Sequence, residues 1–182
     1  MADHSENNTL RTVLHKIADR FASDEAIGER AAIRRLDIDA PDRPEFWKIV
    51  VGELEPLLKQ HGPSLTEYER RWAAILAGLA EVAGAGFHRQ GRRLGEAAAA
   101  AQVHEGRFTK LLRAHDDALL ALVRPLARQI VAQGEHVDWA DVAELVLSDG
   151  RWDEEQIRHR QARSYFTALR KQNASTAQEP TA

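Results

Sequence analysis

The side chains best suited to chemistry in this sequence are arginines and lysines on the polar sides of helical segments. On a helical wheel, Phe108 and Leu111 form the apolar face of one segment. Lys110 and Arg113 lie opposite that face, and Arg107 lies on its flank. Cationic groups on a solvent face can bind phosphate through charge-assisted hydrogen bonds. The spacing therefore predicts a ridge that suits phosphate.

A second cationic segment lies near the C-terminus. Ile157–Lys171 contains six basic residues, His159 included, and no acidic one. On a helical wheel, the face opposite Tyr165 carries Arg160, Arg163, Arg170 and Lys171. Arg158 falls within that face, so we predict an internal salt bridge for it rather than a phosphate contact.

No motif for nucleotide or cofactor chemistry is complete. Gly84–Arg89 begins like a dinucleotide fingerprint but lacks the third glycine and a preceding strand. Gly91–Glu96 lacks the Gly-Lys-Ser/Thr ending of a P-loop. Although distant residues could still meet in space, no neighbouring base supports a nucleophile at Ser23, Ser64, Ser148 or Ser164. We expect no enzymatic activity, no cofactor and no small-molecule substrate.

The spacing of the eight histidines does not predict a metal site. None belongs to a His-x-x-x-His or His-Glu-x-x-His pair, which would place two nitrogens on one helix face. His136 near Asp138 and Asp141 could bind a metal, but helix capping explains both aspartates. The run His115-Asp116-Asp117 is likewise typical of a helix boundary.

The composition limits the class of protein. The 182 residues are 43% apolar, which is enough for one sizeable core or two small lobes. The absence of cysteine excludes disulfides and thiolate metal sites and agrees with a reducing cytoplasm. The polar start is unlike a signal peptide, and no apolar stretch approaches the roughly 20 residues of a membrane span. We therefore expect a cytoplasmic protein that does not contact membranes.

The distribution of charge is uneven. A formal net charge of −3 argues against a generic binder of polyanions. The net charge is −4 over residues 1–85, +3 over residues 86–135 and −2 over residues 136–182. A local cationic ridge is therefore compatible with an otherwise acidic molecule.

Hydrophobic residues follow the helical period in nearly every segment, so the predicted fold class is all-α. We expect a bundle of about seven to nine helices in two small lobes. Residues 9–85 would form the N-terminal lobe and residues 86–172 the C-terminal lobe, with the boundary in the loop after Gly84. The polar segments 1–8 and 173–182 are predicted to be flexible tails.

Local signals place several helix ends. Thr9 is a suitable N-cap for the first helix, and Pro44 fits the first turn of another. Ser64–Glu67 has the pattern of a capping box. Pro125 must either kink its helix or begin a new one, because it has no amide hydrogen to donate. Acidic residues in Asp153–Gln156 mark a further start.

Six segments, four of which carry arginines, occur in a recognisable order: Ala31–Leu36, Pro44–Trp47, Arg92–Gly95, Gly106–Ala114, His136–Trp139 and Ile157–Phe166. In order and spacing they resemble the CasB family, the small subunit of the type I-E CRISPR surveillance complex, Cascade. The resemblance spans roughly residues 9–170, nearly the whole globular part. Two features depart from it: Gln161 replaces an expected tryptophan, and the overall charge is acidic.

This resemblance implies a non-catalytic helical subunit, present in two copies beside the other Cascade subunits. It also implies backbone contacts with guide RNA and target DNA that stabilise the R-loop during antiviral targeting, while guide pairing supplies sequence specificity. An ordinary solvated face is the alternative for each cationic residue. The residues expected to bind nucleic acid are Arg34, Arg35, Arg92, Arg93, Arg107, Lys110, Arg113, Arg160 and Arg163.

Two other functions stay open. One is a helical adaptor that touches only protein and docks its basic ridge on an acidic partner, which the net acidity favours. The other is a helix-turn-helix regulator with Glu105–Ala114 as its recognition helix. Short flanking turns and the lack of a clear paired helix argue against the regulator.

Overall fold

The structure, a computed structural model, describes residues 3–58 and 65–176, and its regular elements are helices. The all-α prediction is therefore confirmed. Within the described part, no helix is both long and apolar enough to cross a membrane. In chain order the elements are α1 (Asp3–Ala22), the 3₁₀ turn η1 (Asp24–Ala26), α2 (Ile27–Arg34), α3 (Pro44–Ile49), the π turn η2 (Val50–Leu54), α4 (Glu55–Leu58), α5 (Leu65–Gly84), α6 (Leu94–Ala100), α7 (Glu105–Arg113), α8 (Asp116–Ala132), α9 (Ala140–Leu147) and α10 (Glu154–Thr176).

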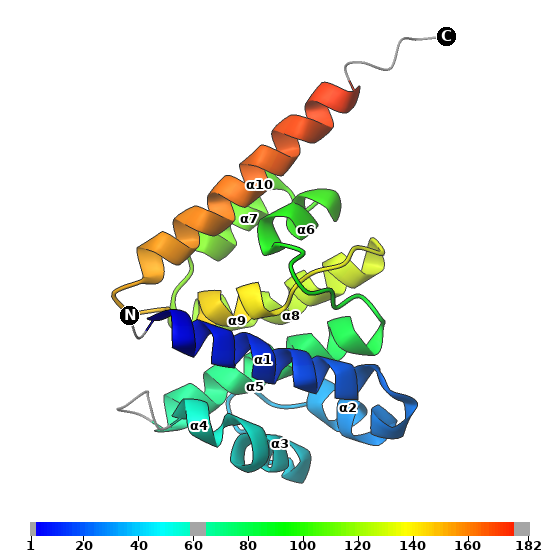
Figure 1. The fold of residues 1–182 in the computed structure, drawn as a ribbon, viewed down its shortest axis with the longest axis vertical. Helices are drawn as coiled ribbons and strands as arrows, with labels where there is room; N and C mark the ends of the chain where they lie inside the picture. The colour runs from blue at the N-terminus through cyan, green and yellow to red at the C-terminus, as the bar shows by residue number, and fades with distance from the viewer. Residues whose placement is uncertain (1–2, 59–64, 177–182) are drawn as a thin grey trace.

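The helices are stacked in layers along the long axis of the molecule. In Figure 1, α1 and α5 cross the middle, α2 to α4 lie below them, and α8 and α9 lie above. Helices α6, α7 and the long α10 form the top of the view. A hydrophobic cluster of buried residues runs through these layers, from Phe46 through Trp72 and Trp139 to Tyr165. The predicted division into two lobes at residue 85 stays a prediction.

One helix starts earlier than predicted, and the structure excludes one of the two alternatives predicted for another. Helix α1 begins at Asp3, before the predicted N-cap Thr9, because no proline or glycine interrupts residues 3–8. Residues 3–8 and 173–176 are therefore helical where tails were expected. Helix α8 continues through Pro125, so a new helix does not begin there.

Other predicted ends agree with the structure. Pro44 occupies the first turn of α3, and the chain continues through the π turn η2 into α4. Helix α5 ends at Gly84, and Gly86 has a positive φ of 80° that glycine tolerates without strain. The start of the predicted capping box, Ser64, lies outside the described residues.

Helices α6 and α10 approach each other closely at Gly95. A Cβ atom at this position would lie 2.5 Å from the Tyr165 amide nitrogen and 2.6 Å from the Gln161 carbonyl oxygen. Both are backbone atoms, so a change of side-chain rotamer cannot make room for the Cβ atom. The glycine therefore sets the distance between the two helices.

Gly95→Ala should lower the free energy of unfolding by about 2 kcal/mol, because the added methyl group forces α6 away from α10. Urea denaturation measures this change. Gly28→Ala is the matched control, since nothing lies within 4 Å of a Cβ at Gly28. The control should be neutral or slightly stabilising. Equal effects of the two substitutions would contradict the close packing at Gly95.

Candidate nucleic-acid interface

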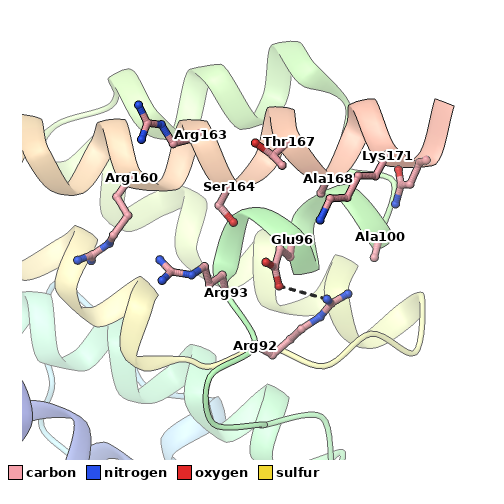
Figure 2. Close-up of a pocket in the computed structure, with 11 residues that line it drawn as sticks. Arg92, Arg93, Glu96, Ala100, Arg160, Arg163, Ser164, Thr167, Ala168 and Lys171 are labelled. Carbon is pink, nitrogen blue, oxygen red and sulfur yellow. Dashed lines mark hydrogen bonds and ion pairs between the residues drawn. The ribbon is translucent and has the colours of Figure 1, made fainter. Parts of the chain in front are cut away.

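A groove of about 690 Å³ lies between α6 and α10, and five of its eleven lining residues are cationic. Figure 2 shows Arg92 and Arg93 on the segment before α6, with Arg92 directed at Glu96. We call it the α6–α10 groove. Its lining consists of Arg92, Arg93, Glu96, Ala100, Arg160, Arg163, Ser164, Thr167, Ala168, Lys171 and Gln172.

Four of the nine predicted residues meet at this groove, in two different states. Arg93 and Arg163 are exposed, and no ion pair joins either of them to another described residue. Arg92 is half-buried and pairs with Glu96 at 3.3 Å. Arg160 is half-buried and pairs with a carboxylate of α9. Arg93 and Arg163 are therefore free to bind an anion, while Arg92 and Arg160 also hold the structure.

Lys171 is a further cation of the groove that the nine predicted site residues did not include, although the helical wheel placed it on the basic face of this helix. Lys171 is exposed one turn beyond Thr167, which itself lies one turn beyond Arg163. In Figure 2, Arg163 lies on the side of α10 away from Arg93, whereas Lys171 extends back toward α6.

An acidic cluster at the start of α9 holds the loop that carries Arg92 and Arg93. We define the α9 acidic cluster as Asp138, Asp141 and Glu144, all of them buried. The amide of Gly91 donates to Asp138 Oδ2 at 2.9 Å, and the amide of Leu94 donates to Asp141 Oδ2 at 3.0 Å. Buried carboxylates that accept backbone amides fix the loop on both sides of the two arginines.

Arg11 of α1 neutralises this cluster from the opposite side. Its guanidinium lies 3.0 Å from Asp138, 2.7 Å from Asp141 and 2.6 Å from Glu144. Arg160 of α10 pairs with Glu144 as well. The α9 acidic cluster thus joins α1, the 91–94 loop and α10, and it orients the α6–α10 groove.

Two carboxyls of this cluster have pKa values that move in opposite directions. Burial acts to raise the pKa of Asp138, but hydrogen bonds from Gly91, His15 and Ala140 and the charge of Arg11 outweigh it and lower the pKa. Burial raises the pKa of Glu144, although Arg11 and Arg160 oppose this effect. Asp138 is therefore the carboxylate that the fold stabilises in its charged form.

Asp138→Asn should lower the free energy of unfolding by about 2 kcal/mol at neutral pH, because buried donors lose a charged acceptor. A lowered folded pKa stabilises the fold above the ordinary aspartate pKa, and this contribution is lost as pH falls through the folded value. The difference from wild type should therefore shrink below about pH 4. Urea denaturation at several pH values measures it. Glu144→Gln should cost less at neutral pH, and the opposite ranking would contradict the assignment.

Helix α7 presents the predicted ridge to solvent. Phe108 and Leu111 are buried, whereas Arg107, Lys110 and Arg113 are exposed, as the helical wheel predicted. Arg107 donates to Gln129 Oε1 at 2.7 Å. Arg107 and Lys110 line a smaller hollow against α8, and Arg113 lines a separate groove between α7 and α10. The ridge is thus continuous along the helix but does not belong to the α6–α10 groove.

Arg34 and Arg35 lie apart from the other predicted residues, at the end of α2. Both are exposed, and Arg34 Nη2 lies 2.7 Å from Glu81 Oε2. The other oxygen of Glu81 lies 3.2 Å from Arg128 Nε. Burial lowers the pKa of Arg124, and the nearby charges of Arg128 and Arg34 lower it further.

Arg34 and Arg128 therefore share one buried carboxylate at the junction of α2, α5 and α8, and Arg124 lies near both of them. Sequence reasoning missed Arg124 and Arg128. Their four-residue spacing on α8 was the available signal.

The prediction for Arg158 is confirmed. Only 9% of the residue is exposed, and its guanidinium lies 2.8 Å from Asp149 and 2.7 Å from Glu154. It also donates to the carbonyl oxygen of Ala114 at 2.9 Å. Arg158 therefore ties α10 to the end of α7 and does not face solvent.

Two groups of three side chains could hold a metal ion within the described residues: His15, His88 and Asp138, and His115, Asp149 and Glu154. An arginine already pairs with a carboxylate in each group, Arg11 with Asp138 and Arg158 with Asp149. A cation would have to compete with these guanidinium groups. Asp138 also accepts from the Ala140 amide, which agrees with its predicted capping role.

Comparisons with solved structures and with a family model point to the same family. The chain matches no curated protein. It resembles two solved structures from Thermus thermophilus, a CRISPR-associated protein of the Cse2 family and CasB, with TM-scores of 0.62 and 0.60. Each is 23% identical, and each match covers 89% of this chain and 98% of the other. This likeness shows the fold.

A match to a family model shows which family the chain belongs to. Residues 29–166 match the family model of the CRISPR-associated protein Cse2. This range includes α3 to α9, most of α2, the start of α10 and all nine predicted site residues. The chain therefore belongs to the Cse2 family of CRISPR-associated proteins.

Proposed function

We propose that this chain is the non-catalytic small subunit of a type I-E CRISPR surveillance complex, Cascade, and that it holds nucleic acid by its phosphate backbone. The observation that carries the proposal is the α6–α10 groove, whose lining has five cationic residues and a single acidic one, Glu96. Cationic groups position a strand without reading its bases. Such binding would stabilise the R-loop, while guide pairing supplies the specificity.

The proposed partners are a second copy of this chain, the other Cascade subunits, guide RNA and target DNA. No residue is assigned a catalytic role, and no cofactor or metal enters the proposal. The cytoplasm is the proposed location, because the complex meets its nucleic acids there.

An adaptor function is the second candidate, and a specific observation supports it. Two of the groove's arginines, Arg92 and Arg160, already pair with carboxylates, and the chain carries a net charge of −3. A surface of this kind could dock on an acidic protein. The regulator alternative has less support, because α6 and α7 both pack against α10 and not as a paired helix-turn-helix unit.

The isolated chain should bind DNA oligonucleotides of unrelated sequence with similar, weak affinities that fall steeply as salt rises. A small number of phosphate contacts would supply the binding free energy. Fluorescence anisotropy across a salt series measures the affinity and its slope. Strong preference for one duplex, with base substitutions costing about 1–3 kcal/mol each, would instead support a regulator.

A further inference from the structure

A second groove of about 690 Å³ lies on another side of α10 and exposes large aromatic rings. It is lined by residues of α7, of the 151–152 turn and of α10, and we call it the α7–α10 groove. Trp152 is 75% exposed and Phe166 is 43% exposed, although both line this groove. The other described tryptophans are at most 39% exposed. Large apolar rings left in water favour binding of a ligand that would cover them.

Basic residues flank the exposed phenylalanine along α10. His159, Arg163, Phe166 and Arg170 are spaced by four, three and four residues along the helix. This spacing places them along one stripe of the helix. Arg163 also lines the α6–α10 groove, so the stripe joins the two grooves. An aromatic ring between cations is the pattern of surfaces that bind single-stranded nucleic acid.

The charged groups that line the α7–α10 groove have different partners. Arg158 pairs with Glu154 at 2.7 Å, and Arg151 lies 3.3 Å from Asp153. Glu155 lies at the rim, with 87% of its side chain exposed. Arg113 lines the groove, and among the described residues it has no ion pair. Arg113 is thus the lining cation available to a phosphate next to the rings.

From these features we infer that the α7–α10 groove receives an unpaired nucleobase, which stacks on Trp152 or Phe166 while Arg113 and Arg163 hold the adjoining phosphates. The inference rests on the proposed function and narrows its ligand to single-stranded nucleic acid. Stacking tolerates any base, because every base has an aromatic face. The groove would therefore add affinity without adding sequence preference.

A protein ligand fits the groove less well. The apolar lining is flanked by the basic residues of the α10 stripe, and one of them, Arg163, also lines the α6–α10 groove. A strand of nucleic acid has both the anionic and the aromatic groups that this surface matches. A protein partner would leave Arg163 and Arg170 to be matched by separate acidic side chains.

The test compares an oligothymidylate strand with an abasic strand of equal length, which keeps the phosphates but lacks the bases. The wild-type chain should bind the oligothymidylate about tenfold more tightly. Trp152→Ala or Phe166→Ala should reduce that preference and leave the salt slope unchanged, because no charge is removed. Trp152→Phe should retain most of the preference for oligothymidylate over the abasic strand. Trp47→Ala is the matched control, since Trp47 is 39% exposed on α3.

The outcomes separate this inference from the proposed function. Equal binding of the two strands by wild type, with both still sensitive to salt, would overturn base stacking and leave backbone binding intact. No binding of either strand would overturn both. If Trp152→Ala leaves strand binding unchanged but prevents co-purification with the other subunits of the complex, the groove is a protein site and the inference is wrong.

Discussion

Reversing three charges of the α6–α10 groove is expected to weaken nucleic-acid binding roughly 100-fold near physiological salt, since each lost phosphate contact removes a release of bound counterions. The variant combines Arg93→Glu, Arg163→Glu and Lys171→Glu. All three residues are exposed, and no ion pair joins any of them to another described residue. The variant should therefore remain folded. Fluorescence anisotropy with a single-stranded oligonucleotide measures the loss.

The salt series provides a second quantity from the same experiment. The slope of log affinity against log salt should decrease by about 0.7 for each lost contact with a single strand. Lys48→Glu is the control, because Lys48 is exposed on α3 and lies in neither groove. The control should change the affinity little. Arg93→Glu alone is the single substitution to compare with this control. An equal loss of affinity for Lys48→Glu and Arg93→Glu would mean that net charge, and not a binding site, determines the affinity.

The largest loss of stability is expected at Trp139. Its side chain is fully buried, and its indole nitrogen donates to the carbonyl oxygen of Ile75 at 2.9 Å. A Cβ at Gly78 would lie 2.2 Å from the Trp139 ring, so α5 meets the ring without an intervening side chain. The ring thus fixes the start of α9, which carries the acidic cluster, against α5.

Trp139→Ala should lower the free energy of unfolding by about 3–5 kcal/mol, because it leaves a large cavity and removes the buried hydrogen bond to Ile75. This is a large part of the total stability of an ordinary domain. Urea denaturation measures the change. Trp139→Phe should lose less stability, and it is the variant to measure if Trp139→Ala does not fold. Trp152→Ala is the matched control at a tryptophan that is 75% exposed, and it should change stability by about 0.5 kcal/mol or less. Similar losses for Trp139→Ala and Trp152→Ala would contradict the assigned packing.

Local patterns predicted most of the helices and the exposed side of α7. Phe108 and Leu111 are buried and Lys110 and Arg113 are exposed, because the helical period alone decides which side of an amphipathic helix faces the core. The buried position of Arg158 followed from the same reasoning. Features that depend on one helix could therefore be predicted.

Features that depend on contacts between two distant segments could not be predicted from the sequence. Asp141 accepts from the amide of Leu94, which lies 47 residues earlier, and Arg160 pairs with Glu144 of a different helix. No local period encodes which helices become neighbours. For the same reason the sequence did not reveal that Arg34 would share Glu81 with Arg128.

The nine predicted cations consequently occupy several places. Four line the α6–α10 groove, three follow the exposed side of α7, and two lie at the end of α2. The nucleic acids proposed as partners would have to follow an extended path to contact all three places. The α6–α10 groove is the place where the cations converge from two elements, so it carries the central claim.

That claim is tested most directly in the assembled complex. The variant Arg93→Glu, Arg163→Glu, Lys171→Glu would be co-expressed with the other Cascade subunits, co-purified and titrated with target DNA over a series of salt concentrations. Phosphate binding predicts that the variant stays in the complex, while target affinity falls and the salt slope becomes shallower by about one unit per lost contact. Loss of the folded variant from the complex, with unchanged target affinity in any complexes that retain it, would show that this surface docks a protein instead.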